Sequence, residues 1–355
     1  MADFQQAPGQ QSSTVSGSPQ LPPAAEGEFV LNNFQFASGA SLSALRLHYR
    51  TLGRVRRDER GVVRNAVLAL HGTGGSGAHL MVAEFAGELF GSGQPLDAGE
   101  YFIVLPDNIG HGQSSRPSDG LHARFPRFGY RDMIVAQHRL LTECLQINHL
   151  RLVMGTSMGG MHTWLWGEDH PDFMDALLPL ASLPAQICAR NRVWRRILTD
   201  AIRNDPEWCA GDYQRQPQSL RTAAQLMFLM GSNPLLRWQQ MPTLNDSDAV
   251  LDAAVDAAIT QLDANDTLFQ FEASRDYDPG PRLEQIRAPL LALTWADDLI
   301  NPPELGILER EIRRVPHGRA IQVPFTAQSR GHETQMIAAC WKHYLLQLLQ
   351  SAPHR

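Results

Sequence analysis

Short apolar segments alternate with amphipathic ones over much of this chain. Residues 65–72 (NAVLALHG) and 101–107 (YFIVLPD) are apolar stretches that end at turn residues, a pattern typical of buried parallel strands. Between them, residues 78–90 have apolar side chains at helical spacing. The same order returns with a helix predicted over 130–147 and a strand over 150–155. This alternation predicts an α/β fold, a mostly parallel sheet with helices on both faces.

The pattern divides the chain into four segments. Residues 1–28 are rich in Gln, Ser, Pro, Gly and Ala, which predicts disorder. Residues 29–183 open with an antiparallel hairpin and form the first part of the α/β core. Residues 184–281 show only helical patterns and are expected to form an inserted helical cap. Residues 282–355 return to strand signals and complete the core, with a final helix predicted over 333–350.

Composition narrows the class of protein. The chain has 355 residues, 43% of them hydrophobic and 19% charged, with a formal net charge of −6, which is ordinary for a globular enzyme and gives no basic footprint for nucleic acid. No apolar run reaches the length of about 20 residues that a membrane-spanning helix needs. The four cysteines show no CxxC or zinc-ligand spacing, so we expect no metal. The first residues lack the features of a signal peptide, which favours a cytoplasmic location; a removed export signal would leave the same pattern.

One serine stands at a sharp turn between apolar and helical patterns. Residues 152–164 (LVMGTSMGGMHTW) place Ser157 between Gly155 and Gly159. A strand that turns abruptly into a helix needs small neighbours, and backbone strain there holds the turning side chain out at the carboxyl edge of the sheet. The segment therefore predicts a G-x-S-x-G nucleophile elbow with Ser157 as nucleophile. The alternative is a glycine-rich turn that contains serine by chance.

Two partners for this serine follow in the chain. A serine hydroxyl needs a base to take its proton, and the base needs a third group to orient it. Asp297 and Asp298 follow the apolar strand LLALTW, and His332 lies in SRGHET near the start of the last predicted helix. Acid then histidine is the order expected of such a triad. Asp298 is favoured because it lies four residues before Pro302, and Asp297 remains an alternative.

Acyl transfer also needs donors for the developing oxyanion. One is expected to be the backbone N–H of Met158, directly after the nucleophile. The other is expected from the turn HGTGGSG at residues 71–77, with Thr73 as the candidate. The absence of G-K-[ST] and of a G-x-G-x-x-G helix start argues against a phosphate cradle there. His71, at the start of this turn, is expected to shape the loop.

Three segments resemble the homoserine O-acetyltransferase branch of the α/β-hydrolase superfamily. They are GTSMGGMHTW, LASLPAQICARNR and AIRNDPEWCAGDY. The resemblance covers about residues 47–349 and implies an α/β-hydrolase fold, an acyl-serine intermediate at Ser157 and a helical cap over the site. It also implies a homodimer formed through the caps and no cofactor beyond the acyl donor.

The resemblance implies substrate-binding residues as well. In this family an arginine just before the AI of AIxxDP binds the substrate carboxylate, and Thr199 occupies that place here. Arg195 and Arg196 lie about one helical turn earlier, and Arg196 is taken as the candidate. Glu333 stands where the family has an acidic residue that contacts the substrate amino group. Tyr213, in the GxY motif, is the third candidate.

Two functions follow from these residues. The leading hypothesis is a serine hydrolase that cleaves a carboxylic ester of a small molecule through a Ser157–His332–Asp298 triad. The alternative is an O-acyltransferase, similar to homoserine or serine O-acetyltransferases, that moves an acyl group from coenzyme A to an amino-acid hydroxyl. Thr199 cannot supply a positive charge, and HGTGG is more like the turn of ordinary hydrolases. We therefore expect ester hydrolysis without acetylation of homoserine.

Overall fold

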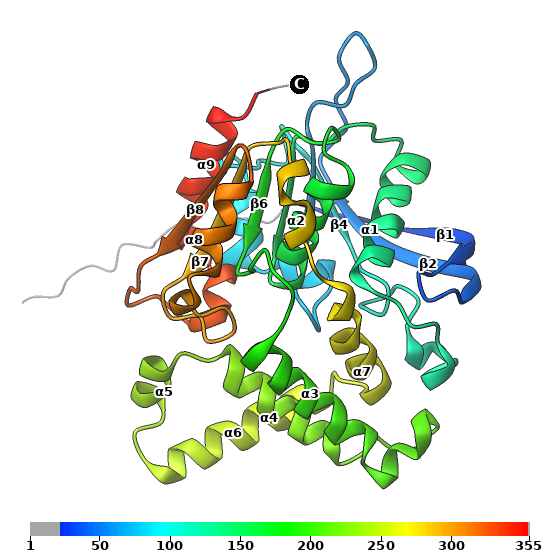
Figure 1. Ribbon diagram of the computed structural model, residues 1–355, viewed down its shortest axis with the longest axis vertical. Coiled ribbons are helices and arrows are strands. Elements are labelled where there is room, and N and C mark those ends of the chain that lie inside the picture. Colours follow the sequence, from blue (N-terminus) through cyan, green and yellow to red (C-terminus); the bar gives the residue numbers. More distant parts are fainter. Residues whose placement is uncertain (1–21, 354–355) are drawn as a thin grey trace, which may run out of the picture.

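The computed structural model describes residues 22–353 (Figure 1). The chain enters the fold through a long antiparallel hairpin, β1 (Ala25–Gln35) and β2 (Ser41–Leu52). Ala25 pairs with Thr51 at the start of the ladder. The prediction of disorder is therefore wrong for residues 25–28, because pairing with β2 supplies hydrogen bonds that the polar composition of this segment does not reveal. The rest of the predicted disordered segment, up to residue 21, lies outside the described residues.

A single eight-stranded sheet forms the centre of the described structure, in the order β1-β2-β4-β3-β5-β6-β7-β8. β2 is antiparallel to both β1 and β4, and the strands from β4 to β8 are parallel to one another. The remaining strands are β3 (Ala66–Leu70), β4 (Phe102–Pro106), β5 (Leu152–Thr156), β6 (Leu177–Leu180), β7 (Leu290–Trp295) and β8 (Gly318–Val323). Every residue of β3 to β7 is buried, as expected for strands covered on both faces. The predicted fold class is confirmed.

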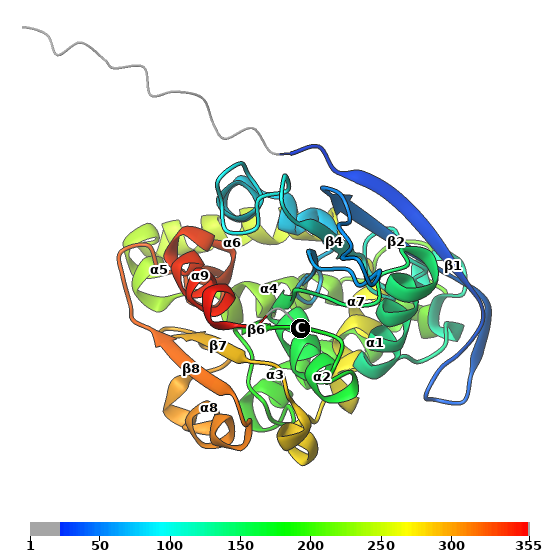
Figure 2. The same cartoon turned by 90° about the horizontal axis from the view of Figure 1, so that it is seen from above.

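Helices cover the two faces of the sheet and enclose two apolar cores (Figure 2). α1 (Tyr130–Arg139), α2 (Met158–Asp169) and α8 (Ile307–Glu311) pack on one face. α9 (Lys342–Ser351) packs on the other, together with the segment after β3.

Two predicted helices differ from the structure in these layers. Residues 78–90 form a 3₁₀ turn and a short π-helical turn instead of one helix, because Val82 between them has an extended backbone. The last helix begins at Lys342, since residues 331–340 form 3₁₀ turns around the non-helical Ile337.

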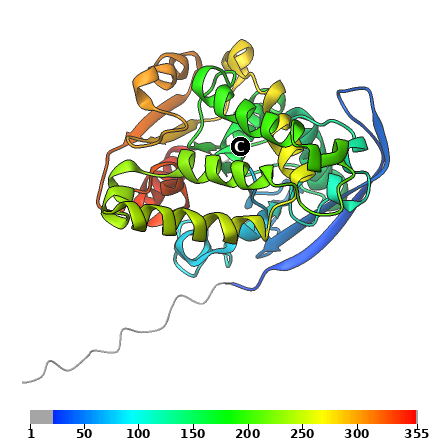
Figure 3. The same ribbon diagram turned by 90° about the horizontal axis from the view of Figure 1, so that it is seen from below.

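The helical insertion lies between β6 and β7 and covers the carboxyl ends of the parallel strands (Figure 1). It contains α3 (Ala189–Arg203), α4 (Ser219–Gly231), α5 (Pro234–Gln240), α6 (Leu244–Ile259) and α7 (Ala264–Glu272). α3, α4 and α7 share a separate apolar core built around Trp194, Leu198, Leu220 and Phe271. Seen from below, α3, α4 and α6 cross the molecule side by side (Figure 3). We call α3 to α6 the cap.

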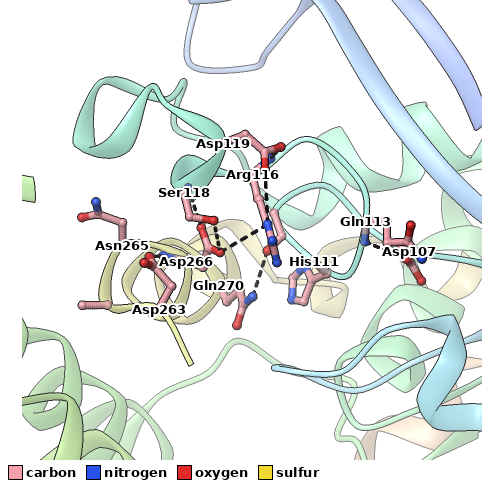
Figure 4. Close-up of polar contacts among 12 residues, drawn as sticks. Asp107, His111, Gln113, Arg116, Ser118, Asp119, Asp263, Asn265, Asp266 and Gln270 are labelled. Atoms are coloured by element: carbon pink, nitrogen blue, oxygen red, sulfur yellow. Dashed lines mark hydrogen bonds and ion pairs between the residues drawn. The ribbon is translucent and has the colours of Figure 1, made fainter. Parts of the chain in front are cut away.

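The loop after β4 joins the core to α7, the helix that leads back from the cap (Figure 4). Ser118 donates to Asp266 from its backbone N–H, over 2.9 Å, and from its hydroxyl, over 2.7 Å. Gln270 donates to the carbonyl of Gly110 over 2.8 Å. Burial raises the pKa of Asp266 to about 6. The same loop carries His111, whose ring lies 5.1 Å from that of His71. Movement of α7 is thus tied to the loop beside the predicted oxyanion turn.

Candidate active site

Ser157 stands at the turn between β5 and α2, in a strained conformation with φ 52° and ψ −107°. The strain is sustained by close backbone packing. A Cβ added to Gly155 would lie 2.3 Å from the carbonyl group of Gly159, and one added to Gly159 would lie 2.1 Å from the carbonyl oxygen of Leu70. Neither position can hold a larger residue without a backbone shift. Both glycines of the elbow are required for this reason.

Ser157, His332 and Asp298 form a continuous hydrogen-bonded row. Ser157 Oγ lies 2.8 Å from Nε2 of His332, and Nδ1 of the same ring lies 2.9 Å from Oδ2 of Asp298. All three residues are buried, and Ser157 is only 8% exposed. The serine and the histidine are separated by 175 residues in the sequence, so the sheet and its loops bring them together. The row can move a proton from the serine to the histidine.

The two neighbouring aspartates have different partners. Asp298 accepts hydrogen bonds from the backbone N–H groups of Ile300 and Asn301, over 2.8 and 3.1 Å, besides its contact with His332. Asp297 instead accepts from the Asn233 side chain and from the N–H of Gly331, at 2.8 Å for the latter. Asp298 is therefore the carboxylate that the structure brings to His332, whereas Asp297 joins the cap to the loop before His332.

The protonation of Asp298 and of His332 is set by burial and by neighbouring groups. Burial would raise the pKa of Asp298, but His332 and the hydrogen bonds from Asn301 outweigh it and hold that pKa below its usual value. Burial would lower the pKa of His332, but Asp298 raises it above its usual value, Glu333 adds to the rise and Arg195 opposes it. Asp298 is thus ionised at neutral pH and stabilises the imidazolium form of His332.

Two backbone N–H groups beside Ser157 have no hydrogen-bond acceptor on the described part of the chain: those of Met158 and Thr73. Met158 is the first residue of α2, where helix N–H groups have no intrahelical partner. Thr73 belongs to the turn after β3, and a Cβ added to the preceding Gly72 would lie 3.5 Å from Cβ of Ser157. Both groups are thus free to donate to an oxygen that forms beside the serine.

A buried arginine, Arg195 on α3, lies close enough to His332 to lower its pKa. It is 2% exposed, and its guanidinium donates to Asn191 Oδ1 over 2.9 Å and to Ser274 Oγ over 3.3 Å. No carboxylate of residues 22–353 pairs with it. Burial lowers the pKa of Arg195, but a guanidinium stays protonated in proteins. A buried cation without a counter-ion is costly, so this position is suited to an anionic group of a substrate.

Two of the residues predicted to bind substrate, Arg196 and Tyr213, lie away from the triad. The neighbour Arg196 is exposed and pairs with Asp200 on the same helix, and the structure brings Arg195 instead toward His332. The Tyr213 hydroxyl donates to Asp263 over 2.7 Å and accepts from the N–H of Asn265, and thereby holds the start of α7 within the insertion. Neither residue has a contact with the triad among the described contacts.

Glu333 directly follows His332 but faces a different space. Its side chain lines an open cleft of about 710 Å³ between the α4–α5 connection and the loop before His332, together with Asn233, Arg237 and Arg330. Its carboxylate still influences His332 electrostatically. The structure therefore places Glu333 at the rim of the site.

Helical periodicity could have identified the buried arginine. On α3, Arg195, Leu198, Thr199 and Ile202 are all buried, and their spacing puts them on one face of a helix. Arg196 is about 100° away from Arg195 around the helix axis. The apolar residues of this segment thus distinguish the two arginines, a signal that an alignment to the family motif alone does not use.

The family model described as alpha/beta hydrolase fold matches residues 65–328. The chain belongs to the α/β-hydrolase fold family. Within it, the chain is 31% identical over 281 residues to a probable acyltransferase of Methanothermobacter thermautotrophicus, covering 79% of this chain and 85% of that protein. It is 36% identical over 195 residues to the homoserine O-acetyltransferase of Thermobifida fusca, covering 51% and 50% of the two chains.

Solved structures of the α/β-hydrolase fold superpose over nearly the whole chain. Homoserine O-acetyltransferase from Bacillus anthracis has a TM-score of 0.81 at 21% identity, covering 93% of this chain and 98% of that one. An acetylester hydrolase from Corynebacterium glutamicum has a TM-score of 0.80 at 21% identity, covering 92% and 96%. In residues 22–353, no helix is long and apolar enough to cross a membrane, and no group of His, Cys, Asp and Glu side chains could hold a metal ion.

Proposed function

We propose that this enzyme, of the hydrolase and O-acyltransferase type, transfers an acyl group through a covalent acyl-serine at Ser157. The observation that carries the proposal is the hydrogen-bonded row from Ser157 Oγ through His332 to Asp298, at 2.8 and 2.9 Å. The strained elbow and the two unpartnered N–H groups of Met158 and Thr73 support it. A homodimer formed through the cap is part of the same proposal.

In the first half-reaction His332 Nε2 takes the proton of Ser157 as Oγ attacks the carbonyl carbon of an ester or thioester. The carbonyl oxygen becomes an oxyanion, which the N–H groups of Met158 and Thr73 stabilise, each worth about 3 kcal/mol in comparable sites. The C–O or C–S bond to the leaving group then breaks. The leaving group departs with the proton from His332, and the acyl group stays on Ser157.

In the second half-reaction a hydroxyl compound attacks the acyl-serine, and His332 takes its proton and returns it to Ser157. If water attacks, the enzyme is an esterase that releases a carboxylic acid. Ester hydrolysis is the first candidate, because the turn at residues 71–77 resembles that of hydrolases.

The second candidate is transfer to the hydroxyl of an amino acid, and the observation that favours it is Arg195. Thr199 cannot supply a positive charge for the carboxylate of homoserine. Arg195 supplies a buried guanidinium from the helical turn before Thr199. Arginine binds carboxylates through bidentate hydrogen bonds. Arg195 therefore supports a carboxylate-bearing acceptor as the second candidate.

One incubation separates these outcomes. The enzyme is given p-nitrophenyl acetate or acetyl-coenzyme A, each with and without millimolar homoserine or serine, and products are identified by mass spectrometry. Hydrolysis alone supports the esterase, and O-acetylated amino acid supports the transferase. Ser157→Ala is the control: turnover and labelling by a fluorophosphonate are both expected to disappear. Labelling that persists in this variant would place the nucleophile elsewhere.

Arg195 and Arg196 form a matched pair for the acceptor. Arg195→Met is expected to raise the KM for a carboxylate-bearing acceptor or ester by about 10²-fold or more, since loss of one partner of a buried charge pair typically costs several kcal/mol. Hydrolysis of neutral p-nitrophenyl acetate is expected to change far less. Arg196→Met, an exposed position, is expected to alter neither. Equal effects on charged and neutral substrates would contradict a carboxylate role for Arg195.

A further inference from the structure

A row of buried polar side chains runs through the core behind the triad and ends at the oxyanion turn. It consists of Trp166, Gln137, Asn108 and His71, of which none is more than 2% exposed. The residues come from α2, α1, the loop after β4 and the end of β3. None of them belongs to the triad, and burying so many polar groups is costly unless each is paired.

The direction of every hydrogen bond in this row follows from the chemistry of its members. The indole N–H of Trp166 can only donate, and it lies 2.7 Å from Oε1 of Gln137, which must therefore be the acceptor. The amide nitrogen of Gln137 then faces Oδ1 of Asn108 at 2.5 Å. This leaves the Asn108 amide nitrogen to donate to Nε2 of His71 over 3.0 Å.

The same arrangement determines the protonation of His71. The backbone N–H of Asn108 also points at Nε2 of His71, at 3.2 Å, so this nitrogen is an acceptor independently of the side-chain amides. Burial lowers the pKa of His71 to about 4, and the ring is neutral at pH 7. Its proton is therefore on Nδ1, which lies 2.9 Å from the carbonyl oxygen of Gly72 and donates to it.

The hydrogen bond from His71 to the carbonyl of Gly72 also orients the backbone N–H of Thr73. The C=O of one residue and the N–H of the next belong to one planar peptide unit and point in opposite directions. The carbonyl of Gly72 also accepts from the N–H of Gly75 over 3.0 Å. Two donors thus hold one side of the peptide plane, and they direct the Thr73 N–H to the other side.

We propose that Gln137 is a positioning residue that acts through Asn108 and His71 to orient the Thr73 N–H toward the oxyanion beside Ser157. The proposal rests on the proposed acyl-serine function. Gln137 accepts the indole N–H of Trp166 with its oxygen, and its amide nitrogen faces both Oδ1 of Asn108 and Nδ1 of His162, the latter at 3.2 Å. If Gln137 cannot donate, Asn108 is free to turn its amide over, and Nε2 of His71 then loses the side-chain donor and keeps only the backbone N–H of Asn108 at 3.2 Å, which weakens the hold on the ring.

The test is Gln137→Met, which keeps the size of the side chain but cannot hydrogen-bond. The kcat for p-nitrophenyl acetate, divided by the burst amplitude that counts competent sites, is expected to fall about 10- to 100-fold. This is less than the loss typical when an oxyanion donor is removed outright. KM is expected to stay within about twofold, because the oxyanion forms only in the transition state. Gln270→Met is the matched control, since Gln270 also bonds the loop after β4 but lies outside the row. It is expected to keep kcat within about threefold.

A second measurement is made on the wild-type enzyme and does not depend on the folding of Gln137→Met. In ¹⁵N-histidine-labelled wild-type enzyme, with His71→Asn used for assignment, the His71 ring is expected to carry its proton on Nδ1. A proton on Nε2 in the wild type would overturn the proposal, as would a Gln137→Met variant with unchanged kcat per competent site. A Ser157→Ala enzyme that keeps the wild-type turnover and fluorophosphonate labelling would refute the proposed function itself. These failures are therefore distinguishable.

Discussion

Replacing Asp298 with asparagine exchanges one oxygen for an NH₂ group, and the structure determines which one. Oδ1 of Asp298 accepts from two backbone N–H groups, those of Ile300 and Asn301, at 2.8 and 3.1 Å. An asparagine is expected to keep its oxygen there, because an NH₂ group would face two backbone donors that cannot turn away, whereas Oδ2 faces two side-chain donors, those of His332 and of Asn301. Its NH₂ group is then forced to the place of Oδ2, 2.9 Å from Nδ1 of His332.

That NH₂ group changes the tautomer of the histidine. Two donors cannot face each other, so Nδ1 of His332 must become the acceptor and its proton must move to Nε2. Nε2 lies 2.8 Å from Ser157 Oγ and can then no longer accept the serine proton. The wrong tautomer in a serine triad lowers kcat by about 10⁴-fold, equivalent to about 5 kcal/mol at about 1.4 kcal/mol per factor of ten. We expect a loss of that size for Asp298→Asn.

The assay is the steady-state hydrolysis of p-nitrophenyl acetate at pH 7.5, with thermal unfolding measured alongside to show that the fold is retained. Asp297→Asn is the matched control one residue away. Asp297 contacts Asn233 and the N–H of Gly331, so this variant is expected to loosen the contact between cap and core and to cost far less activity. A loss below tenfold for Asp298→Asn, or a larger loss for Asp297→Asn, would refute the assignment of the acid.

Three further outcomes test other parts of the structure. Activity requires neutral His332, whose raised pKa puts the acid limb of kcat/KM at a higher pH than an ordinary histidine would. Because Glu333 raises that pKa, Glu333→Gln is expected to move the limb to lower pH, whereas an unmoved limb would contradict this influence. Gly159→Ala is expected to destabilise the fold by about 1–3 kcal/mol or more and to abolish activity, because its Cβ would lie 2.1 Å from a carbonyl oxygen; denaturant unfolding measures the first and ester hydrolysis the second. Trp238 of the cap is 75% exposed, so Trp238→Glu is expected to convert a dimer to a monomer in sedimentation, and a monomeric wild type would reject the dimer.

Local pattern was sufficient for the layers of the fold and for the position of Ser157 at the turn between β5 and α2. The strands β3 to β7 are continuous apolar segments because both of their faces are covered, and the residue types alone therefore predict that they are buried. The glycines on either side of Ser157 likewise predict the elbow, because only glycine allows its close backbone contacts. The order of acid and histidine follows from the order of strands along the chain. The apolar strands and the glycines of the elbow depend on residues that are near one another in the sequence.

Residues 25–28 and the helix expected over 78–90 show where local pattern is insufficient. The first segment has the composition of a disordered tail, but it pairs with β2 and becomes a strand. The second has helical spacing, but Val82 is extended between two short turns. For residues 25–28, pairing with a separate strand determines the backbone, because tertiary contacts override weak local preferences.

The side chains around the triad were decided only by the tertiary structure. Asp297 and Asp298 are adjacent and chemically identical, and their roles separate because the backbone donors of the following turn face only Asp298. The direction in which α3 packs brings Arg195 toward the site and leaves Arg196 in solvent. The hydrogen bond from Gln137 to Asn108 joins residues 29 positions apart. Such contacts depend on distances of a few tenths of an ångström between separate elements, which exist only after the sheet and helices have packed.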